Sequence, residues 1–449
     1  MTFPGWLVAM VAMVATRHGW LPRLPTGGPP NKCTALPGNN MVNHGVVIGP
    51  AVFFQTKSLE DCMANCSSYC ATGMGAYNWG GKDCTCRDAG ARIGPYNASG
   101  GRDPTGFTCT TSCSAGEVAP STLNGAGSAC DWERATYQLG LIEFYHASAD
   151  PDALAQAYAW AESIDYKLCR YNVTAGMNPQ QIQDAGPHNA DHQLAGATFA
   201  ELYNIDRNQS HIADMVEIFN AEITTPIVAK NWSWIDAIHM GMNPYARLGN
   251  VTGKQKYLDK MFELFNQTAF TAELGPYHKA LWDNSTKLFF RDGSYVRKGI
   301  FWSRANGWAI TALANSIRFA KSAVHLEVYT AIFKDLATKL ATVQGSDGAW
   351  RASLLNASGF PDPETTGTAN FVYGMAWGVR TGLLDSATFL PVIDKGWNWL
   401  SATAIQPNGL VGYCQPVGAS PASITPAMTS NFCVGQFLLA AAEVSKLTK

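Results

Sequence analysis

The sequence has little charge and no excess of either sign. Lys and Arg number 32 against 34 Asp and Glu, which gives a formal net charge of -2 at pH 7, and charged residues make up only 15% of the chain. A protein without surplus basic side chains lacks the charge that holds a phosphate backbone or an anionic membrane surface. We therefore expect neither nucleic acid nor a membrane as a partner.

Long apolar runs are also missing. The stretch from Trp6 to Ala15 is too short to span a bilayer, but it has the length of a signal-peptide core. A basic segment does not precede it, so a buried amphipathic start is the alternative. We predict a signal peptide over residues 1–18 and a secreted, extracellular protein.

Cysteine is abundant and unevenly placed. Eight of the twelve cysteines fall between Cys33 and Cys113, and nine Asn-x-Ser/Thr sequons occur, Asn97 and Asn356 among them. Dense, even-numbered cysteines are typical of disulfide-stapled secreted domains, and sequons favour a glycoprotein. The Cys84-x-Cys86 pair could instead bind a metal, but thiolate zinc sites suit reducing compartments. We predict disulfides, no metal and no cofactor.

At 449 residues the chain exceeds what one core usually covers, and its texture changes twice. We predict a Pro/Gly-rich linker over 19–32 and a small disulfide-rich α+β module over 33–115. In that module Leu59–Cys66 indicates one helical turn, and Ala76–Trp79 with Asp83–Cys86 indicates a hairpin. The cysteine pattern resembles PAN/apple-type modules, and wall-binding WSC-type modules are similar. A cell-wall polysaccharide is its expected partner.

From residue 120 to 449 the sequence predicts helices separated by short polar loops, many of them apolar on nearly every face. This pattern favours an all-α (α/α)6 barrel. Leu288–Tyr295 suggests a short hairpin arm. Cys130 with Cys169, and Cys414 with Cys433, would form disulfides that each close an end of the barrel, or remain as buried free thiols. The expected helices span Asp131–Ala147, Pro151–Leu168, Asp191–Asn204, His211–Ile227, Trp234–Leu248, Lys254–Phe270, Arg304–Phe319, Leu326–Val343, Thr366–Gly382, Ala387–Ser401 and Phe432–Leu447.

Two carboxylates stand out within the helical region. Asp236 lies among apolar neighbours near a helix start, where a desolvated carboxyl can hold a proton and deliver it. Asp191 lies where another helical period begins. Either residue could instead merely cap its helix, because Asp at a helix N-terminus needs no functional role.

An arginine and a tryptophan form the next candidate pair. Arg304 and Trp308 are four residues apart and share one helical face. A guanidinium fork beside an aromatic plate suits an acidic sugar, although a buried Arg packed on Trp is the alternative. His192 and His239 lack a metal-ligand pattern, and ordinary hydrogen-bonded histidines are expected.

At these residues the chain resembles glycoside hydrolase family 105, the unsaturated rhamnogalacturonyl and glucuronyl hydrolases. The likeness spans roughly 125–449 and leaves out the cysteine-rich module. Four motifs carry it in the family's order, and two later segments continue it. They are Asp191–Gly196, Trp234–Asp236, Phe301–Trp308 and Glu364–Ala369, followed by Gly374–Val379 and Gly382–Asp385.

The resemblance implies a hydrolase that removes a 4,5-unsaturated uronic acid from the non-reducing end of oligosaccharides left by polysaccharide lyases. An Asp protonates the C4=C5 enol ether, water adds at C5, and the hemiketal opens to release the next sugar. By motif position Asp236 is the acid/base and Asp191 supports it. The implied substrate-binding residues are Arg304, Trp308, Trp234, Arg291, His239 and Thr366.

One position departs from the family pattern. Many members carry a histidine that helps to hold the substrate where this chain has Arg291, in the run Phe289–Asp292. The replacement puts the preference between unsaturated galacturonyl and glucuronyl substrates in doubt. Pectin fragments of rhamnogalacturonan type are the favoured substrate. A polysaccharide lyase and an inert secreted carbohydrate-binding protein remain the competing hypotheses.

Overall fold

The structure is a computed structural model that describes residues 129–169, 189–227, 232–271, 279–296 and 298–447, and the backbone of seven strands between residues 32 and 110. The chain divides into two compact units. The first comprises Met1–Thr122, Ala404–Gly412 and Thr429–Asn431, and the second comprises Leu123–Thr403, Tyr413–Met428 and Phe432–Lys449. The predicted signal peptide lies outside the described residues.

The N-terminal strands pair in two antiparallel sheets. Five of them form a sheet in the order β1-β7-β4-β5-β3, and β2 pairs with β6. The hairpin expected from the sequence is confirmed, since Ala76 lies opposite Arg87 and Trp79 opposite Cys84. The expected helical turn at Leu59–Cys66 lies outside the described residues. The strands are β1 (Lys32–Leu36), β2 (Asn39–Val42), β3 (Val52–Gln55), β4 (Ala76–Trp79), β5 (Asp83–Arg87), β6 (Arg92–Pro95) and β7 (Thr105–Thr110).

Among the described residues of the second unit, six helices are buried on nearly every face. In α11 and α13, for example, the residues from Ser303 to Ser316 and from Thr365 to Gly378 are all buried. Helices that are enclosed in this way form the inside of a helical assembly. These inner helices are α3 (Trp132–Ser148), α7 (Ala195–Asp206), α9 (Asp236–Thr252), α11 (Ser303–Phe319), α13 (Thr365–Arg380) and α15 (Asn431–Val444).

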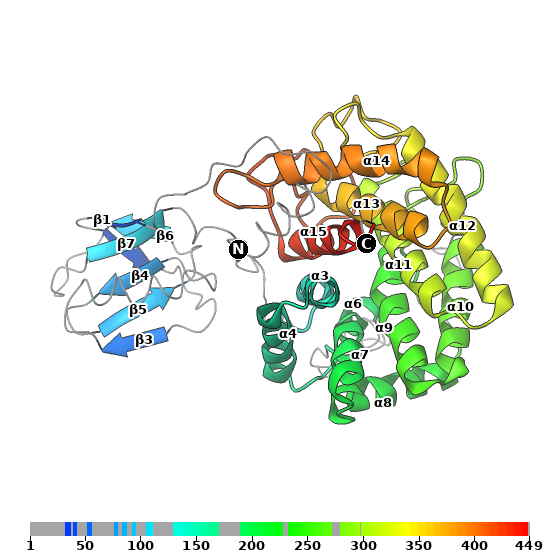
Figure 1. Cartoon of the computed structure of the whole chain (residues 1–449), viewed down its shortest axis with the longest axis horizontal. Coiled ribbons are helices and arrows are strands. Elements are labelled where there is room, and N and C mark those ends of the chain that lie inside the picture. The colour runs from blue at the N-terminus through cyan, green and yellow to red at the C-terminus, as the bar shows by residue number, and fades with distance from the viewer. Residues whose placement is uncertain are drawn as a thin grey trace. The chain divides into compact units, whose positions relative to one another are not determined.

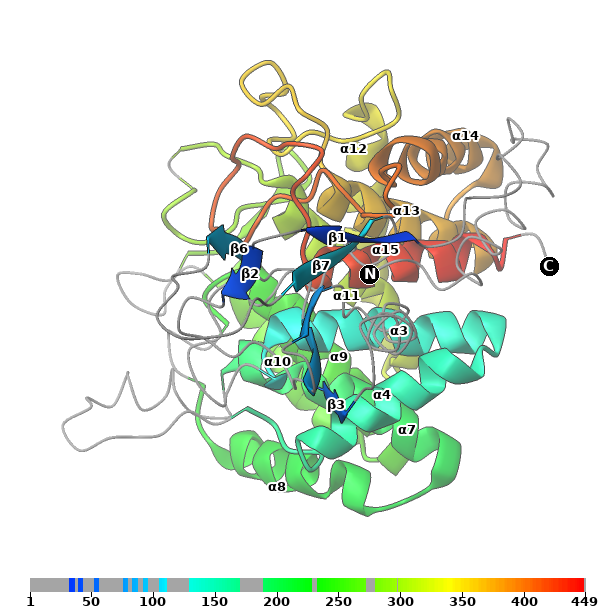
Figure 2. The same ribbon diagram turned by 90° about the vertical axis from the view of Figure 1, so that its left-hand side faces the viewer.

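The intervening helices bury one stripe each and cover the inner ones (Figure 1). In α12 the buried positions recur every three or four residues, which is the spacing of a single helical face. Figure 2 shows α8 and α14 at opposite edges of this unit. The outer helices are α4 (Pro151–Ser163), α8 (Ser210–Thr224), α10 (Gln255–Phe270), α12 (Ala323–Thr342) and α14 (Ser386–Trp399).

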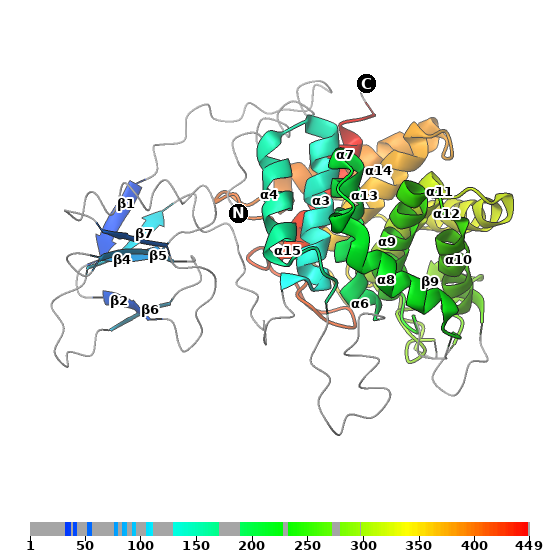
Figure 3. The same cartoon turned by 90° about the horizontal axis from the view of Figure 1, so that it is seen from below.

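The inner helices follow one another around a ring. Successive contacts join α3 to α7, α7 to α9, α9 to α11 and α11 to α13. Figure 3 shows α3 and α7 side by side. The last helix closes the ring, because Gly140 of α3 and Gly435 of α15 touch backbone to backbone. An ion pair between Arg380 and Glu443 joins α13 to α15. The all-α barrel expected from the sequence is confirmed.

A few element bounds differ from expectation for local reasons. Helix α4 ends at Ser163 rather than Leu168, because Asp165 and Tyr166 adopt left-handed backbone angles, with φ of 53° and 52°. The expected helix from Asp191 is divided into α6 (Ala190–Gln193) and α7. The hairpin arm pairs β8 (Trp282–Asp283) with β9 (Leu288–Phe289), so it begins earlier than Leu288.

A buried ion network ties the inner helices together. The Arg247 guanidinium lies 2.7 Å from Glu143 of α3 and 2.8 Å from Glu201 of α7, and it also donates to Asn243 at 3.0 Å. Asn315 of α11 donates to the same Asn243 oxygen at 2.9 Å. Each buried charge of the network lies beside a charge of opposite sign, so no buried ion is left unpaired. The network therefore holds the three helices in one register.

Both disulfides expected in the barrel are present. Cys130 bonds to Cys169, which joins the residues before α3 to those after α4. Cys414 bonds to Cys433 of α15. Neither pair is therefore left as free thiols. No helix among the described residues is long and apolar enough to cross a membrane.

Candidate active site

The motif residues gather where inner helices begin. Asp236 is the first residue of α9, Arg304 the second of α11 and Thr366 the second of α13. Ring contacts join further helix starts, since Trp132 of α3 packs against Trp308 of α11 and against Phe432 of α15. The positive ends of several helix dipoles therefore lie at one end of the barrel, which favours negative charge there.

Asp236 owes its position to a segment more than fifty residues further along the chain. Trp234 forms an isolated antiparallel bridge with Asp292, and the Ile235 amide donates to the Arg291 carbonyl oxygen at 2.8 Å. This pairing explains why α9 begins at Asp236 and not at Trp234 as expected. Ile235 occupies the N-cap position and makes no side-chain capping bond, so Asp236 does not cap its own helix.

The same pairing brings Arg291 against Asp236. The Nε atom of Arg291 lies 3.2 Å from Oδ2 of Asp236, and its Nη1 donates to Oδ2 of Asp292 at 2.7 Å. Burial would lower the pKa of Arg291, but the charges of Asp236 and Asp292 raise it above its usual value. The position at which the chain departs from the family pattern is thus in direct contact with the expected catalytic acid.

Asp191 carries the most perturbed carboxyl of the site. Burial, followed by the negative charges of Asp236 and Asp131, raises the pKa of Asp191 to about 7, against the opposing effect of Arg291. Asn189, not Asp191, caps α6, since its side chain accepts from the Asp191 amide at 3.1 Å. A carboxyl that stays protonated near neutral pH can donate a hydrogen bond or a proton.

Arg304 is buried and bonded to a distant loop. It is 1% exposed, and its Nη1 and Nη2 donate to the carbonyl oxygens of Gln415 at 2.6 Å and Pro416 at 2.9 Å. Its guanidinium also stacks over Trp302 at 4.2 Å. Burial lowers the pKa of Arg304 to about 10, so the side chain stays charged at neutral pH. These contacts support the alternative interpretation, in which Arg304 is a buried residue that packs against its neighbours.

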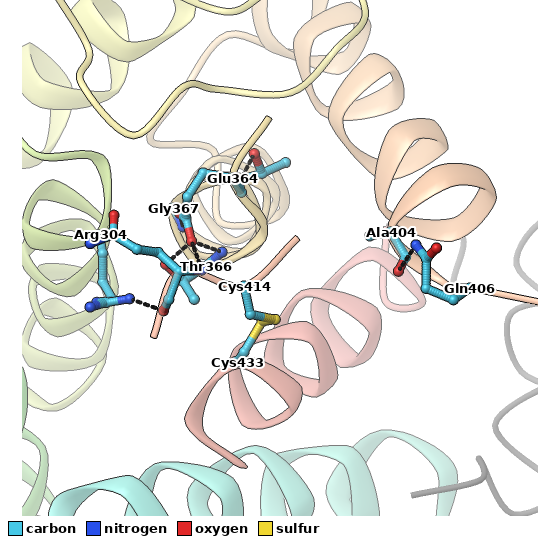
Figure 4. The surroundings of a disulfide bond; sticks show 10 residues. Arg304, Glu364, Thr366, Gly367, Ala404, Gln406, Cys414 and Cys433 are labelled. Carbon is cyan, nitrogen blue, oxygen red and sulfur yellow. Dashed lines mark hydrogen bonds between the residues drawn. A yellow bond between two sulfur atoms is a disulfide. The ribbon is translucent and has the colours of Figure 1, made fainter. Parts of the chain in front are cut away.

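Glu364 fastens the same loop to α13 (Figure 4). Its fully buried carboxylate caps the helix, accepting from the amides of Thr366 at 3.0 Å and Gly367 and from the Thr366 hydroxyl at 2.6 Å. The amide of Gln415 donates to the same carboxylate at 3.3 Å. The Thr366 hydroxyl is therefore already bonded to Glu364. The neighbouring Cys414–Cys433 disulfide holds the loop to α15.

His239 lies one turn after Asp236, beneath the surface of the site. It is fully buried, its ring is 4.4 Å from that of Trp308, and its Nδ1 is 3.3 Å from the Asn243 amide nitrogen. Burial, assisted by Arg247, lowers the pKa of His239 to about 3, so the ring is neutral. Trp308 is likewise only 1% exposed.

The structure thus brings Asp191, Asp236 and Arg291 together and places Arg304 within reach of the charge of Asp236. Asp292 and Gln415 were not among the site residues expected from the sequence. Their only signals were that Asp292 follows Arg291 and that Gln415 follows Cys414.

Comparison with known proteins gives these residues a family context. The model of Glycosyl Hydrolase Family 88 matches residues 115–448, whereas the motifs had led us to expect family 105. A curated relative, "Unsaturated 3S-rhamnoglycuronyl hydrolase" of Formosa agariphila, is 34% identical over 232 residues. That alignment covers 48% of this chain and 58% of the relative, so the chain spans little more than half of its length.

Two solved structures share the fold at similar levels. "Glycosyl hydrolase family 88 from Bacteroides vulgatus" is 29% identical with a TM-score of 0.62, and the match covers 71% of this chain and 92% of that one. A protein described as a polysaccharide lyase is 32% identical with a TM-score of 0.62, over 70% and 90% of the two chains. Because the family model covers most of the barrel and its motif residues, the chain belongs to the glycoside hydrolases of Glycosyl Hydrolase Family 88.

Proposed function

We propose that this protein removes a 4,5-unsaturated uronic acid from the non-reducing end of oligosaccharides produced by polysaccharide lyases. Rhamnogalacturonan fragments of pectin are the proposed substrate. The observation that carries the proposal is a pair of carboxylates, Asp191 and Asp236, coupled through Arg291. The curated relative named for an unsaturated rhamnoglycuronyl substrate supports the same class.

In the proposed reaction Asp236 protonates C4 of the C4=C5 enol ether, which leaves positive charge at C5 and the ring oxygen. Water adds at C5, and its second proton returns to the Asp236 carboxylate. The resulting hemiketal opens as the bond between C5 and the ring oxygen breaks and the C5 hydroxyl proton passes to the ring oxygen. The hemiacetal left at C1 then collapses to an aldehyde, and its hydroxyl proton leaves with the aglycone oxygen. Asp191, protonated near neutral pH, supports this cycle by donating a hydrogen bond. The N-terminal end of α11, with Arg304 and Trp308, forms the wall against which the ring is proposed to bind.

We also propose where the whole protein acts and what its N-terminal part binds. It acts outside the cell after secretion, and residues 33–115 serve as a module that binds cell-wall polysaccharide. The two disulfides in the barrel support an oxidising compartment.

The experiment follows the ultraviolet absorbance of the unsaturated uronate. With lyase-generated disaccharides the absorbance should fall, since the C4=C5 double bond is consumed. Asp236→Asn should lose roughly 10² to 10⁴-fold in kcat, because the amide keeps the shape but cannot donate the proton. Asp259→Asn, an exposed position on α10, is the control and should retain full activity. Activity of Asp236→Asn within a factor of about three of the parent would remove the acid role.

A polysaccharide lyase is the second candidate, favoured by the similarity to the protein described as one. A lyase creates the unsaturated bond by abstracting the C5 proton and expelling the C4 substituent. With intact acidic polysaccharide the absorbance would then rise, and with the unsaturated disaccharides it would not change. A binding protein would change neither signal.

A further inference from the structure

We propose that Arg291 and Asp292 form a unit that binds the substrate's carboxylate, in which Asp292 fixes the guanidinium and the uronate takes over the contact now made by Asp236. This inference rests on the proposed function, and it adds a positioning residue, Asp292, to the site.

The site is rich in negative charge. Asp236 and Asp292 both contact Arg291. An incoming uronate adds one more carboxylate to this group. Such a ligand binds only where a cation offsets the repulsion between like charges.

Among the described residues, Arg291 and Arg304 both interact with the charge of Asp236, and the two differ in access. Arg304 is 1% exposed, and both of its terminal nitrogens are engaged by backbone carbonyls. The Arg291 side chain is 25% exposed, and among the described residues its Nη2 has no hydrogen-bond partner. Arg291 is therefore the guanidinium that a substrate can reach without dismantling the loop at Gln415.

The two existing contacts of Arg291 are unequal. Its bond to Asp292 is a well-formed hydrogen bond of 2.7 Å, and the other oxygen of Asp292 is held by the Ser294 amide at 2.8 Å. The Asp236 contact is an ion pair of 3.2 Å, in which neither Nε nor Oδ2 has a hydrogen-bond partner. Asp292 is thus the fixed partner, and the contact with Asp236 is the one that a better acceptor displaces.

The planar shape of the Arg291 guanidinium determines how a carboxylate can bind to it. With Nη1 committed to Asp292, the edge formed by Nε and Nη2 remains, and a carboxylate binds such an edge through two parallel hydrogen bonds. Because the backbone pairing at Trp234 and Ile235 sets Arg291 beside Asp236, a carboxylate on this edge lies next to the proposed acid. The carboxyl group is a substituent of C5, so the C4=C5 bond is brought to the same place.

The test compares an unsaturated disaccharide with its uronate methyl ester, which has lost the charge. The wild-type protein should prefer the free acid by roughly 10- to 100-fold in kcat/KM, the usual value of a hydrogen bond to a charged group. Arg291→Gln should reduce this preference to less than about threefold. Arg291→Lys should keep part of it, because the charge remains but the fork is lost.

Asp292→Asn should raise KM for the free acid and leave kcat near the parent value, since Arg291 keeps its charge but loses its fixed orientation. The matched control is Arg351→Gln, which breaks a surface pair with Asp347 formed by two bonds of 3.0 Å and should leave the preference unchanged.

An Arg291→Gln protein that is folded and still prefers the free acid as strongly as the parent would overturn the proposal, as would a parent with no preference. If Arg291→Gln does not fold, an Arg291→Lys protein with undiminished preference decides against it. Failure of the parent to cleave either compound would instead contradict the proposed function.

Discussion

At Asp191 the raised pKa gives the site a protonated carboxyl but makes the folded protein less stable at higher pH. An aspartate in an unfolded chain titrates near pH 4, whereas burial and the neighbouring Asp236 and Asp131 raise the pKa of Asp191 to about 7. Between these two pH values the folded protein keeps a proton that the unfolded chain releases. Folding therefore becomes less favourable as pH rises from about 4 to about 7, and the full cost persists above that.

Asp191→Asn should accordingly stabilise the protein at pH 8 and change little at pH 4. Three pK units set a ceiling of about 4 kcal/mol, and the partial exposure of the residue lowers the expected gain to about 1–3 kcal/mol. Denaturant unfolding at both pH values, with the disulfides intact, measures the gain. A gain of equal size at pH 4 and pH 8 would show that the titration of Asp191 is not its cause.

A second substitution, at Arg304, separates the effect of its positive charge from the effect of its planar guanidinium. Arg304→Lys keeps the charge but cannot reach both Gln415 and Pro416 with the same geometry. If Arg304 binds substrate, KM should rise by the equivalent of about 1.5–3 kcal/mol. If it only anchors the loop, the melting temperature falls and KM is unchanged. Both quantities should be measured on one preparation.

Among the secondary-structure elements, the closing contact of the ring is the most sensitive to added volume. Helices α3 and α15 approach so closely that a methyl group on Gly435 would overlap the Thr136 carbonyl oxygen. The overlapping atoms belong to the backbone, which cannot relieve the overlap by changing rotamer as a side chain can. The two helices would therefore have to move apart.

Gly435→Ala should therefore lower the free energy of unfolding by at least about 2 kcal/mol, although alanine is the better helix former. Gly418→Ala is the control, because a methyl group there would meet its nearest atom at 3.5 Å, an ordinary contact distance. Equal stability of the two variants would mean that α3 and α15 tolerate a wider separation.

For the whole molecule, the division of labour between its parts can be tested by truncation. All motif residues lie within the stretch matched by the family model, residues 115–448. A protein consisting of residues 119–449 should fold and cleave a small unsaturated disaccharide with kcat/KM close to that of the full chain. The same truncation carrying Asp236→Asn provides the inactive control. A folded but inactive truncated protein would show that the N-terminal residues contribute to catalysis.

The sequence by itself determined the helices, their enclosure and the two carboxylates at helix starts. Helical period and capping depend on neighbours three or four residues away, so α3, α10 and α11 begin and end within one residue of expectation. The tertiary structure alone decided that Arg291 meets Asp236 and that the donors of Arg304 are used by carbonyls more than one hundred residues away. Contacts of that kind, and the burial that raises the pKa of Asp191, depend on how distant segments pack, which no local pattern encodes.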